Sequence, residues 1–498
     1  MIQVKFYNFS YAQIVCDNSI MFDLKDYFSF FADGYQFNPK YRYGNWSGKI
    51  YLLENNGLLP IGLVQYVKKF CSNFGYQCQI DPSIVEQEPI TKSQFQEWIN
   101  SKAIFDGMKK IEPYWYQVDA AFEGIKNRRK LLSLPTSAGK SLIQALMSKY
   151  YTENYEGKVL ILVSTSSLTT QMRDDFRNYR LFKGEEVLEI RSGTKKDSDA
   201  VIYVSTWQTA IKQPAEWLEQ FGMVLNDECH LATGASISKI IKGLTNCMFK
   251  AGLSGSLKDG KANTMQYISM FGDIFKPITT RELMDAGQVT KLKINALFLR
   301  YPDQACKAMK GLTYEEEIKS IIGYSKRNAV VERLAVKLAK EKDENVFVMF
   351  RREKHGKSMF NNIKNIHKDV YYISGEVSIE ERNDLKKLLE TKKGVIVVAS
   401  YGVCSTGISI KNLHHVIFAH GVKSKITVLQ SIGRVLRKHD SKSVAVLWDI
   451  IDNAGIEPKS KESKKKYSHM NYCLQHGIGR IERYASEEFD YSIKTINL

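Results

Sequence analysis

The chain has few prolines and cysteines for its length. Only 10 of its 498 residues are proline, and 44% are hydrophobic against 25% charged, which excludes a fibrous or broadly disordered protein. The 8 cysteines form no Cys-x-x-Cys pair, which disfavours a zinc or iron–sulfur framework and favours reduced thiols. The first residues lack a basic segment followed by an apolar stretch, and no apolar run approaches the ~18 residues of a membrane span. We therefore expect a cytoplasmic protein that is neither secreted nor membrane-bound.

Acidic side chains are too few to balance the basic ones. The chain carries 71 Lys and Arg against 54 Asp and Glu, a formal net charge of +17 at pH 7. The excess lies between residues 101 and 450 rather than at the ends. A basic field of this size favours a polyanionic partner such as nucleic acid, with basicity for solubility alone as the alternative.

The hydrophobic pattern predicts an α/β protein. A chain of 498 residues should hold roughly three domains of about 150 residues each. Short β-branched runs alternate with helix-length amphipathic stretches, as parallel strands do when helices cover both faces of their sheet. The predicted strands span residues 158–164, 201–205, 223–226, 347–350, 370–374, 395–400, 415–419 and 444–449. We expect two doubly wound parallel sheets in tandem.

The two ends of the chain have a different pattern. The first hundred residues are rich in Tyr, Phe, Asn and Gly, and residues 37–53 alternate like two strands around the turn 45–48. We predict a small α+β domain there. The strand-poor segment 301–345 would join the two sheet domains. The predicted divisions are an N-terminal domain at 1–100, sheet domains at 101–300 and 301–455, and a charged linker with a short helical tail at 456–498.

A phosphate-binding loop is the sharpest local signal. It reads Leu134-Pro135-Thr136-Ser137-Ala138-Gly139-Lys140-Ser141 and precedes a helical stretch. Backbone N–H groups of such a loop can wrap a phosphate, Lys140 can bridge the outer phosphates, and the Ser141 hydroxyl can ligate Mg²⁺. Leu134 stands where the G-x-x-x-x-G-K-[ST] pattern has its first glycine, so the loop alone also fits a chance match.

Two acidic residues follow a predicted strand farther along the chain. Asp227 and Glu228 come directly after an apolar run, at the strand end where open parallel sheets bind ligands. Asp227 can hold Mg²⁺ through water, and Glu228 can orient or deprotonate the attacking water. A solvated loop acid would explain one carboxylate more easily than an adjacent pair in this place.

A third motif lies in the second sheet domain. The segment Gln430-Ser431-Ile432-Gly433-Arg434-Val435-Leu436-Arg437 carries arginines three residues apart. On a helix, Arg434 and Arg437 would share one face and would be suited to neutralise a γ-phosphate bound on the neighbouring domain. An ordinary basic helix face is the alternative, and the other two motifs weaken it.

In order and spacing, these motifs resemble those of superfamily 2 helicases over residues 113–449. The resemblance implies two RecA-like domains that use ATP and Mg²⁺. It assigns adenine reading to Gln117, with stacking on the base by Trp115 or Tyr116. It assigns nucleic-acid contacts to Thr165, Thr206, Gln208, Ser374 and Thr406, coupling of hydrolysis to movement to His230, Ser254 and Ser256, and nucleotide contacts to Gly407 and Gln430. Ser409 stands where many members carry an acid, so its role is open.

The resemblance is closest to the UvsW family of recombination helicases of large tailed phages. It is carried by PTSAGKS, NDECHLATG, GLSGSL, QSIGRVLRKH and the N-terminal YRYGNW. The family remodels DNA with ATP, unwinding R-loops and D-loops and migrating Holliday junctions and stalled forks. The resemblance therefore implies a DNA-stimulated ATP hydrolase of the host cytoplasm. Its expected partners are branched DNA and single strands, with recombination and single-strand-binding proteins as candidates and a monomer as the working oligomeric state.

The N-terminal aromatics offer a second DNA surface. Arg42, Tyr43 and Trp46 interleave charge and rings on the predicted hairpin, which suits phosphate contact and stacking. Rings that pack on their own domain are an equal alternative.

Two other functions fit parts of the sequence. An RNA helicase would use the same motor, and a non-catalytic nucleic-acid clamp would share the fold. Intact Lys140, Glu228 and Arg437 disfavour the clamp. A nuclease motor is disfavoured because no acid-rich metal cluster is evident outside the motor.

Overall fold

The computed structural model divides the chain into two compact units, Met1–Ile278 and Thr279–Leu498. It describes residues 1–191, 199–375, 377–402, 410, 412–424, 427–428, 431–433, 436, 439, 442–458 and 467–498. No helix in this described part is both long enough and apolar enough to cross a membrane.

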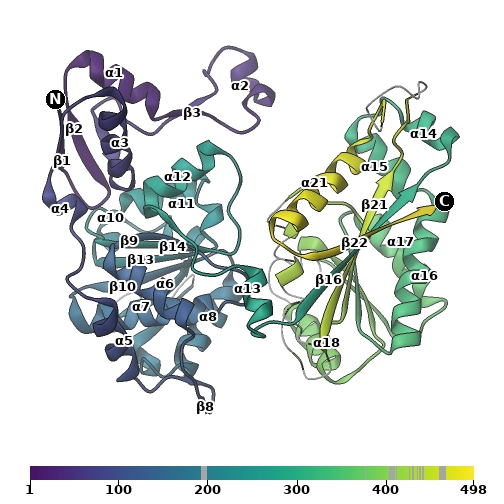
Figure 1. Ribbon diagram of the computed structural model, residues 1–498. Helices are drawn as coiled ribbons and strands as arrows, with labels where there is room; N and C mark the ends of the chain where they lie inside the picture. Colours follow the sequence, from purple (N-terminus) through teal and green to yellow (C-terminus); the bar gives the residue numbers. More distant parts are fainter. Residues whose placement is uncertain are drawn as a thin grey trace. The chain divides into compact units, whose positions relative to one another are not determined.

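The N-terminal domain is a four-stranded sheet covered by two helices (Figure 1). Its strands have the order β5-β2-β1-β6, with β6 parallel to β1 and the other neighbours antiparallel. Apolar residues at every second position of β1 and β2 point into one core with the buried faces of the helices. The elements are β1 (Ile2–Phe6), β2 (Tyr11–Val15), α1 (Asn18–Tyr27), β5 (Leu58–Pro60), α3 (Val64–Phe74) and β6 (Cys78–Ile80).

The hairpin predicted over residues 37–53 is wrong in its first strand. Residues Pro39–Arg42 form the short helix α2 after the 3-10 turn η1 (Tyr35–Phe37). The Asn38 side chain accepts a hydrogen bond from the Lys40 amide, and Pro39 occupies the first helical position, where it needs no N–H partner. The strand that does form, β4 (Lys49–Tyr51), pairs instead with β3 (Ser29–Phe31).

The first motor-type sheet expected from the resemblance, the large sheet of the first unit, has seven parallel strands in the order β11-β12-β10-β13-β14-β9-β15, which confirms the predicted doubly wound fold. Helices pack on both of its faces (Figure 1), and β10 is buried from its second residue onward. The strands are β9 (Arg129–Ser133), β10 (Lys158–Val163), β11 (Val187–Ile190), β12 (Ile202–Thr206), β13 (Phe221–Asp227), β14 (Phe249–Ser254) and β15 (Ile274–Phe275). The helices are α5 (Lys92–Asn100), α6 (Trp115–Lys126), α7 (Lys140–Asn154), α8 (Ser166–Asn178), α9 (Trp207–Ala210), α10 (Ala215–Glu219), α11 (Ala235–Gly243) and α12 (Lys261–Phe271). Three short elements precede α6 in the chain: α4 (Pro82–Val85) and the strand pair β7 (Phe105–Asp106) and β8 (Lys109–Lys110).

The N-terminal domain and the first motor sheet are packed together within this unit. Met265 and Ile268 of α12 are buried in the N-terminal core. The buried Lys250 ammonium of β14 donates to Ser10 Oγ at 2.6 Å, and the Phe9 amide donates to the Thr245 carbonyl at 3.0 Å. Helix α5 falls within the N-terminal domain predicted at 1–100, but it packs against α6 and α7 of the first seven-stranded sheet, with the Phe95 and Tyr150 ring centroids 5.5 Å apart.

The second unit contains another seven-stranded parallel sheet, in the order β18-β19-β17-β20-β21-β16-β22. Its strands are β16 (Lys291–Arg300), β17 (Val346–Phe350), β18 (Val370–Ile373), β19 (Ile396–Ser400), β20 (His415–Phe418), β21 (Val444–Asn453) and β22 (Asp490–Asn497). Its helices are α13 (Thr280–Asp285), α14 (Asp303–Met309), α15 (Tyr314–Ile322), α16 (Ser325–Lys342), α17 (Glu353–Lys364), α18 (Ile379–Thr391) and α21 (Tyr472–Ser486).

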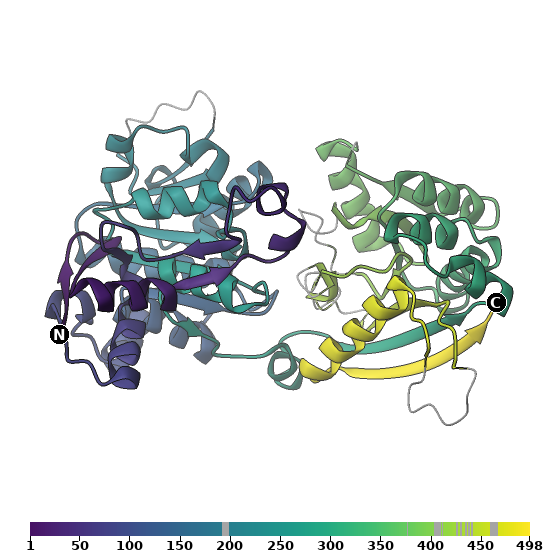
Figure 2. The same ribbon diagram turned by 90° about the horizontal axis from the view of Figure 1, so that it is seen from above.

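Three predictions about the domain organisation differ from this structure. Strand β16 lies before the boundary set at 300, yet it pairs along its whole length with β21 of the second sheet. The tail is more than a helix, because β22 pairs with β16 from Lys293↔Asp490 to Arg300↔Asn497 (Figure 2). The segment 301–345 forms α14, α15 and α16 of the second unit rather than a connection between domains.

Candidate active site

The candidate residues of the first unit follow neighbouring strands of one sheet. Parallel strands end at the same edge, and this edge binds ligands in open α/β sheets. Three adjacent strands, β13, β14 and β9, end at Asp227, at Ser254 and in the phosphate loop. The next three, β10, β12 and β11, lead into Thr165, Thr206 and Arg191. The nucleotide candidates and the strand-contacting candidates therefore occupy two halves of one edge.

The phosphate loop turns sharply between β9 and α7. Ser137 and Gly139 have left-handed backbone angles, with φ of 71° and 76°, and Lys140 is the first residue of α7. The positive φ of Gly139 favours glycine, and a Cβ atom there would lie 2.2 Å from Gln117 Nε2, so a larger residue would strain the backbone and displace the Gln117 side chain. Leu134 is buried and its amide donates to the Ser254 carbonyl at 2.9 Å, so it extends the strand where the usual pattern has a glycine.

Gln117 holds this loop from the preceding helix. Its side chain is 5% exposed. Nε2 donates to the Ala138 carbonyl at 3.0 Å, and Oε1 accepts from the Tyr114 amide at 2.9 Å. The glutamine predicted to read adenine therefore braces the phosphate loop.

The two predicted stacking rings have opposite environments. Trp115 is 58% exposed, whereas Tyr116 is 1% exposed in the core. Tyr116 offers no free face to a base, because it lies on the buried side of α6, so the prediction for it is wrong. The half-exposed Tyr114, which the sequence did not single out, stacks on Tyr116 with ring centroids 5.7 Å apart.

The acid pair and the serine-rich motif form one polar cluster. Glu228 has a left-handed backbone with φ of 52°, and its Oε2 lies 3.1 Å from His230 Nδ1. Ser254 Oγ lies 3.0 Å from the same His230 nitrogen and 2.9 Å from the Ser256 carbonyl oxygen. Tyr267 OH fixes the His230 backbone through a 2.9 Å hydrogen bond to its carbonyl. Of the three residues predicted to couple hydrolysis to movement, His230 and Ser254 thus contact Glu228, and Ser256 joins them through Ser254.

The cation predicted for this site fits the chemistry of Asp227. Burial, and secondly the neighbouring Glu228 charge, raise the pKa of Asp227 to about 7, while Lys140 opposes the shift. A buried carboxylate with an adjacent acid is stabilised by an added positive charge. Gln144 Nε2 donates weakly to Asp227 Oδ1 at 3.4 Å, and the Glu228 backbone N–H and the Lys140 charge also favour the charged carboxylate.

Ser141, the other predicted Mg²⁺ ligand, contacts a residue that the motifs did not reveal. Its hydroxyl lies 2.7 Å from Tyr179 OH, at the end of α8. Burial raises the pKa of the nearby Asp175 to about 6, although hydrogen bonds from Ser141 and Gln171 oppose it. No sequence spacing links α7 to the end of α8, so only the packing of these helices identifies the cluster.

The strand-contacting candidates of the first unit make local hydrogen bonds, and among the three only the Thr206 side chain caps a helix. Thr165 is the N-cap residue of α8, with Oγ1 3.1 Å from Ser167 Oγ. Thr206 is buried, and its Oγ1 accepts from the Thr209 amide at 3.3 Å to cap α9. Gln208 is exposed, and its Nε2 donates to the Ser164 carbonyl at 3.4 Å. Gln208 is therefore the most available of the three predicted contacts.

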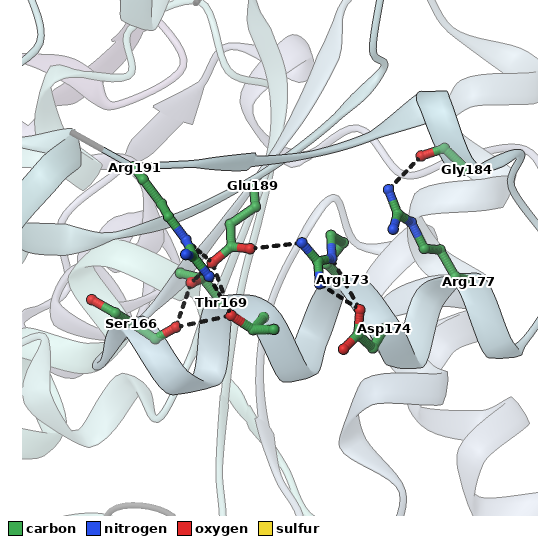
Figure 3. Close-up of polar contacts among 9 residues, drawn as sticks. Ser166, Thr169, Arg173, Asp174, Arg177, Gly184, Glu189 and Arg191 are labelled. Carbon is green, nitrogen blue, oxygen red and sulfur yellow. Dashed lines mark hydrogen bonds and ion pairs between the residues drawn. The ribbon is translucent and has the colours of Figure 1, made fainter. Parts of the chain in front are cut away.

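A buried carboxylate organises the far end of the same edge (Figure 3). Glu189 of β11 is bound by Arg173 Nη1 at 3.0 Å, by Arg191 Nε at 2.8 Å and by the Thr169 hydroxyl. Burial alone would raise the pKa of Glu189, but hydrogen bonds led by Arg191 lower it. Arg177, farther along α8, donates separately to the Gly184 carbonyl at 3.0 Å. Sequence motifs did not mark Arg191, which is mostly exposed at the edge.

In the second unit, only part of the predicted site is described. Ser374 is buried at the end of β18. Thr406, Gly407, Ser409, Gln430, Arg434 and Arg437 lie outside the described residues.

The N-terminal candidates have mixed environments. Tyr43 is 80% exposed, and Arg42 Nε donates to the Gln36 carbonyl at 3.2 Å. Trp46 is partly buried, and its Nε1 donates to the Lys49 carbonyl at 3.0 Å. Tyr43 thus presents a free ring, whereas Trp46 also supports the local fold.

Three family models match successive parts of the chain. The model described as DNA helicase UvsW, N-terminal, matches residues 1–81. Type III restriction enzyme, res subunit, matches residues 98–258, and the helicase conserved C-terminal domain matches residues 325–439.

Similar proteins extend over the whole chain. The sequence is 62% identical over 501 residues to the ATP-dependent DNA helicase uvsW of Enterobacteria phage T4, and the match covers 100% of both. The crystal structure of T4 UvsW has 60% identity and a TM-score of 0.54, and covers 100% of this chain and 99% of that one. The DNA 3'-5' translocase XPB2 of Sulfurisphaera tokodaii is 24% identical over 369 residues, which cover 68% of this chain and 81% of the translocase.

Proposed function

The chain belongs to the UvsW family of ATP-dependent DNA helicases, and from this premise we propose that it remodels branched DNA. ATP hydrolysis by a superfamily 2 motor and action on DNA follow from the family. The proposed substrates are four-way junctions, forks, R-loops and D-loops. The observation that carries this proposal is the N-terminal domain, which is bonded to the first motor sheet through Ser10, Lys250 and α12.

The nucleotide half of the sheet edge supports defined roles for its residues. Lys140 and the backbone of the phosphate loop bind the phosphates, and Gln117 keeps the loop in shape. Trp115, exposed beside Gln117, stacks on the base. Ser141 and Asp227 would hold Mg²⁺, which neutralises phosphate charge when bound. Glu228 orients the attacking water.

The arginine pair supplies charge late in the reaction. We assign to Arg434 and Arg437 the stabilisation of the negative charge that develops on the transferred phosphate. An arginine of this kind can contribute ~10³-fold or more to the rate. Its loss should reduce turnover more than ATP affinity.

The cluster beside Glu228 supports a route from hydrolysis to movement. Loss of the γ-phosphate changes the charge next to Glu228, and His230 and Ser254 contact its carboxylate directly. Strand β13, which ends at the acid pair, is the direct neighbour of β10, which leads to Thr165, and β12, which leads to Gln208, lies one strand farther. A displacement of Asp227 or Glu228 can therefore be transmitted over few residues to Thr165 and Gln208, the residues proposed to bind DNA.

Because the N-terminal domain packs firmly on the first sheet, it favours the processing of DNA junctions over the unwinding of plain duplex. It can hold a second DNA arm while the motor tracks the first, with Arg42 and Tyr43 as contacts. Branch migration regains each base pair that it breaks, whereas net unwinding opposes stacking of about 1.4 kcal/mol per step. A motor with modest grip can thus migrate a junction more easily than it opens a long duplex.

The test compares a mobile four-way junction, an R-loop and a long tailed duplex at the same ATP and salt concentrations. We expect the junction and R-loop to be resolved faster. Tyr43→Ala should slow junction processing, and Tyr7→Ala serves as the matched control because Tyr7 is also exposed in the same domain. Faster opening of the long duplex, or equal effects of the two substitutions, contradicts the proposal. Stronger ATPase stimulation by RNA than by DNA would favour the RNA helicase alternative.

A further inference from the structure

Helix α21 donates side-chain hydrogen bonds to the backbone of one loop of the second unit. The helix (Tyr472–Ser486) lies beyond the segment matched by the helicase C-terminal family model, which ends at residue 439. It packs along β21, and the chain continues from it into β22 of the same sheet (Figure 1). The loop that it contacts, residues 419–424, follows β20 and precedes the arginine motif.

Side chains hold four carbonyl groups of this loop. The Ala419 carbonyl accepts from Arg327 of α16, and the His420 carbonyl accepts from Tyr401 OH at 2.8 Å. Two arginines of α21 hold the next part. Arg480 Nη1 donates to the Val422 carbonyl at 3.1 Å, and Arg483 Nη1 donates to the Lys423 carbonyl at 2.7 Å. Because side chains rather than a strand ladder satisfy these groups, the loop path depends on where those side chains stand.

Arg480 is itself fixed. Its guanidinium makes three hydrogen bonds with Asp449 of β21, from Nη2 to Oδ1 at 2.8 Å and from Nε to Oδ2 at 2.9 Å and to Oδ1 at 3.1 Å, and both side chains are fully buried. Tyr484 OH donates to the same carboxylate at 3.0 Å. A Cβ atom on Gly421 would lie 3.3 Å from Arg480 Nη1, so the backbone passes very close to this arginine. A buried bidentate arginine–carboxylate pair of this kind fixes both the orientation of the guanidinium and its distance from the carboxylate.

The held loop leads directly into the segment of the arginine motif. Ser424 Oγ accepts from the Thr427 amide at 3.2 Å, and the Ser424 carbonyl accepts from the Val428 amide at 3.1 Å. Both hydrogen bonds turn the chain back onto Ser424. Residues 431–433 are helical, and Ser431 and Ile432 are buried. The side chains of α21 therefore bond to the backbone immediately before this turn.

We propose that α21 is a positioning element for the arginine pair, acting through the bonds from Arg480 and Arg483 to the loop 419–424. The inference rests on the proposed role of Arg434 and Arg437. Arg480 and Arg483 are positioning residues, since neither is proposed to touch ATP. An arginine acting in the transition state needs accurate placement, so loosening the loop should lower kcat and leave ATP binding unchanged.

The test uses Arg483, because it is partly exposed and its loss removes one hydrogen bond without opening the core. Arg483→Met should lower the DNA-stimulated kcat by 3- to 10-fold, with KM for ATP and the thermal midpoint unchanged. Arg483→Lys keeps a donor and should recover most of the rate. Arg177→Met is the matched control, because it also removes one arginine–carbonyl bond, to Gly184, and should leave kcat unchanged.

A double substitution separates positioning from a general loss of structure. In an Arg437→Lys background, which keeps the charge but loses the planar fork, adding Arg483→Met should cost less than it does in the wild-type chain. Full additivity, a change confined to KM, or an unchanged kcat for Arg483→Met overturns the inference while the proposed function stands. An Arg437→Ala variant with wild-type hydrolysis refutes the proposed role of the arginine pair itself, and the inference falls with it.

Discussion

Replacing Gly139 by alanine should lower the affinity for ATP about a hundredfold. Gly139 has φ of 76°, and an added Cβ atom would meet Gln117 Nε2 at 2.2 Å. The substitution therefore strains the backbone and displaces the side chain that braces the phosphate loop. Both effects act on the conformation that binds phosphate.

The magnitude follows from two contributions. A non-glycine residue in the left-handed region costs roughly 1–2 kcal/mol. Moving Gln117 breaks its bonds to the Ala138 carbonyl and the Tyr114 amide, at roughly 0.5–1.5 kcal/mol each. The sum is about 2–5 kcal/mol, and a central value near 3 kcal/mol corresponds to about a hundredfold in the dissociation constant.

Titration with a fluorescent ATP analogue would measure the change. Gly75→Ala is the matched control, because Gly75 has φ of 72° at the end of α3 and nothing lies within 4 Å of its added Cβ atom. It should cost stability without changing ATP affinity. The double variant Gly139→Ala/Gln117→Ala should bind ATP no more weakly than Gly139→Ala. A less than threefold change for Gly139→Ala would refute the assignment of this loop to phosphate binding.

Three further outcomes are expected. Glu228→Gln should bind ATP normally and lose more than about tenfold in hydrolysis, measured as phosphate release, because the amide keeps the shape of the site without its charge; a larger residual rate contradicts the role. Deleting residues 1–81 should lower the urea-unfolding free energy of the first unit by about 3–6 kcal/mol, since two apolar side chains of α12 lose their cover; an unchanged free energy argues against the packing described. The second unit should lose stability as pH falls below about 6.5. Burial, with the Arg327 charge next, lowers the pKa of His355 and His420 to about 3, so between these pH values the unfolded chain binds more protons than the folded one and stability rises with pH; a flat unfolding profile from pH 7.5 to 5 contradicts this.

The central strands and the phosphate loop could be predicted because their signals are local. A buried parallel strand is a short apolar run wherever it lies, and β10, β12, β13 and β17 were visible on that basis. The loop before Lys140 needs glycine and small residues in one short stretch, whatever surrounds it. Asp227 and Glu228 are likewise consecutive in the sequence, so their proximity needs no knowledge of the fold.

Edge strands and short helical turns were harder to predict from the sequence. Strand β22 is mostly exposed and gains its place from backbone pairing with β16, so it has no strong apolar pattern. The helix at Pro39–Arg42 depends on the Asn38 cap, which competes with an alternating pattern that also suits a strand. In both cases a local hydrogen bond or a distant partner decided between two conformations that the same residues permit.

The α/β class, the order of the motifs and the chemical types at the nucleotide site follow from the order of residues along the chain. Which side chains are available to act depends on how the elements pack. This packing buries Tyr116 and exposes Trp115 on the same helix, joins Glu228 to Ser254 across two strands, and places Arg480 beneath a loop 58 positions away. A motif reflects local backbone requirements, whereas burial and long-range hydrogen bonds depend on which elements pack together, and the whole chain sets that packing.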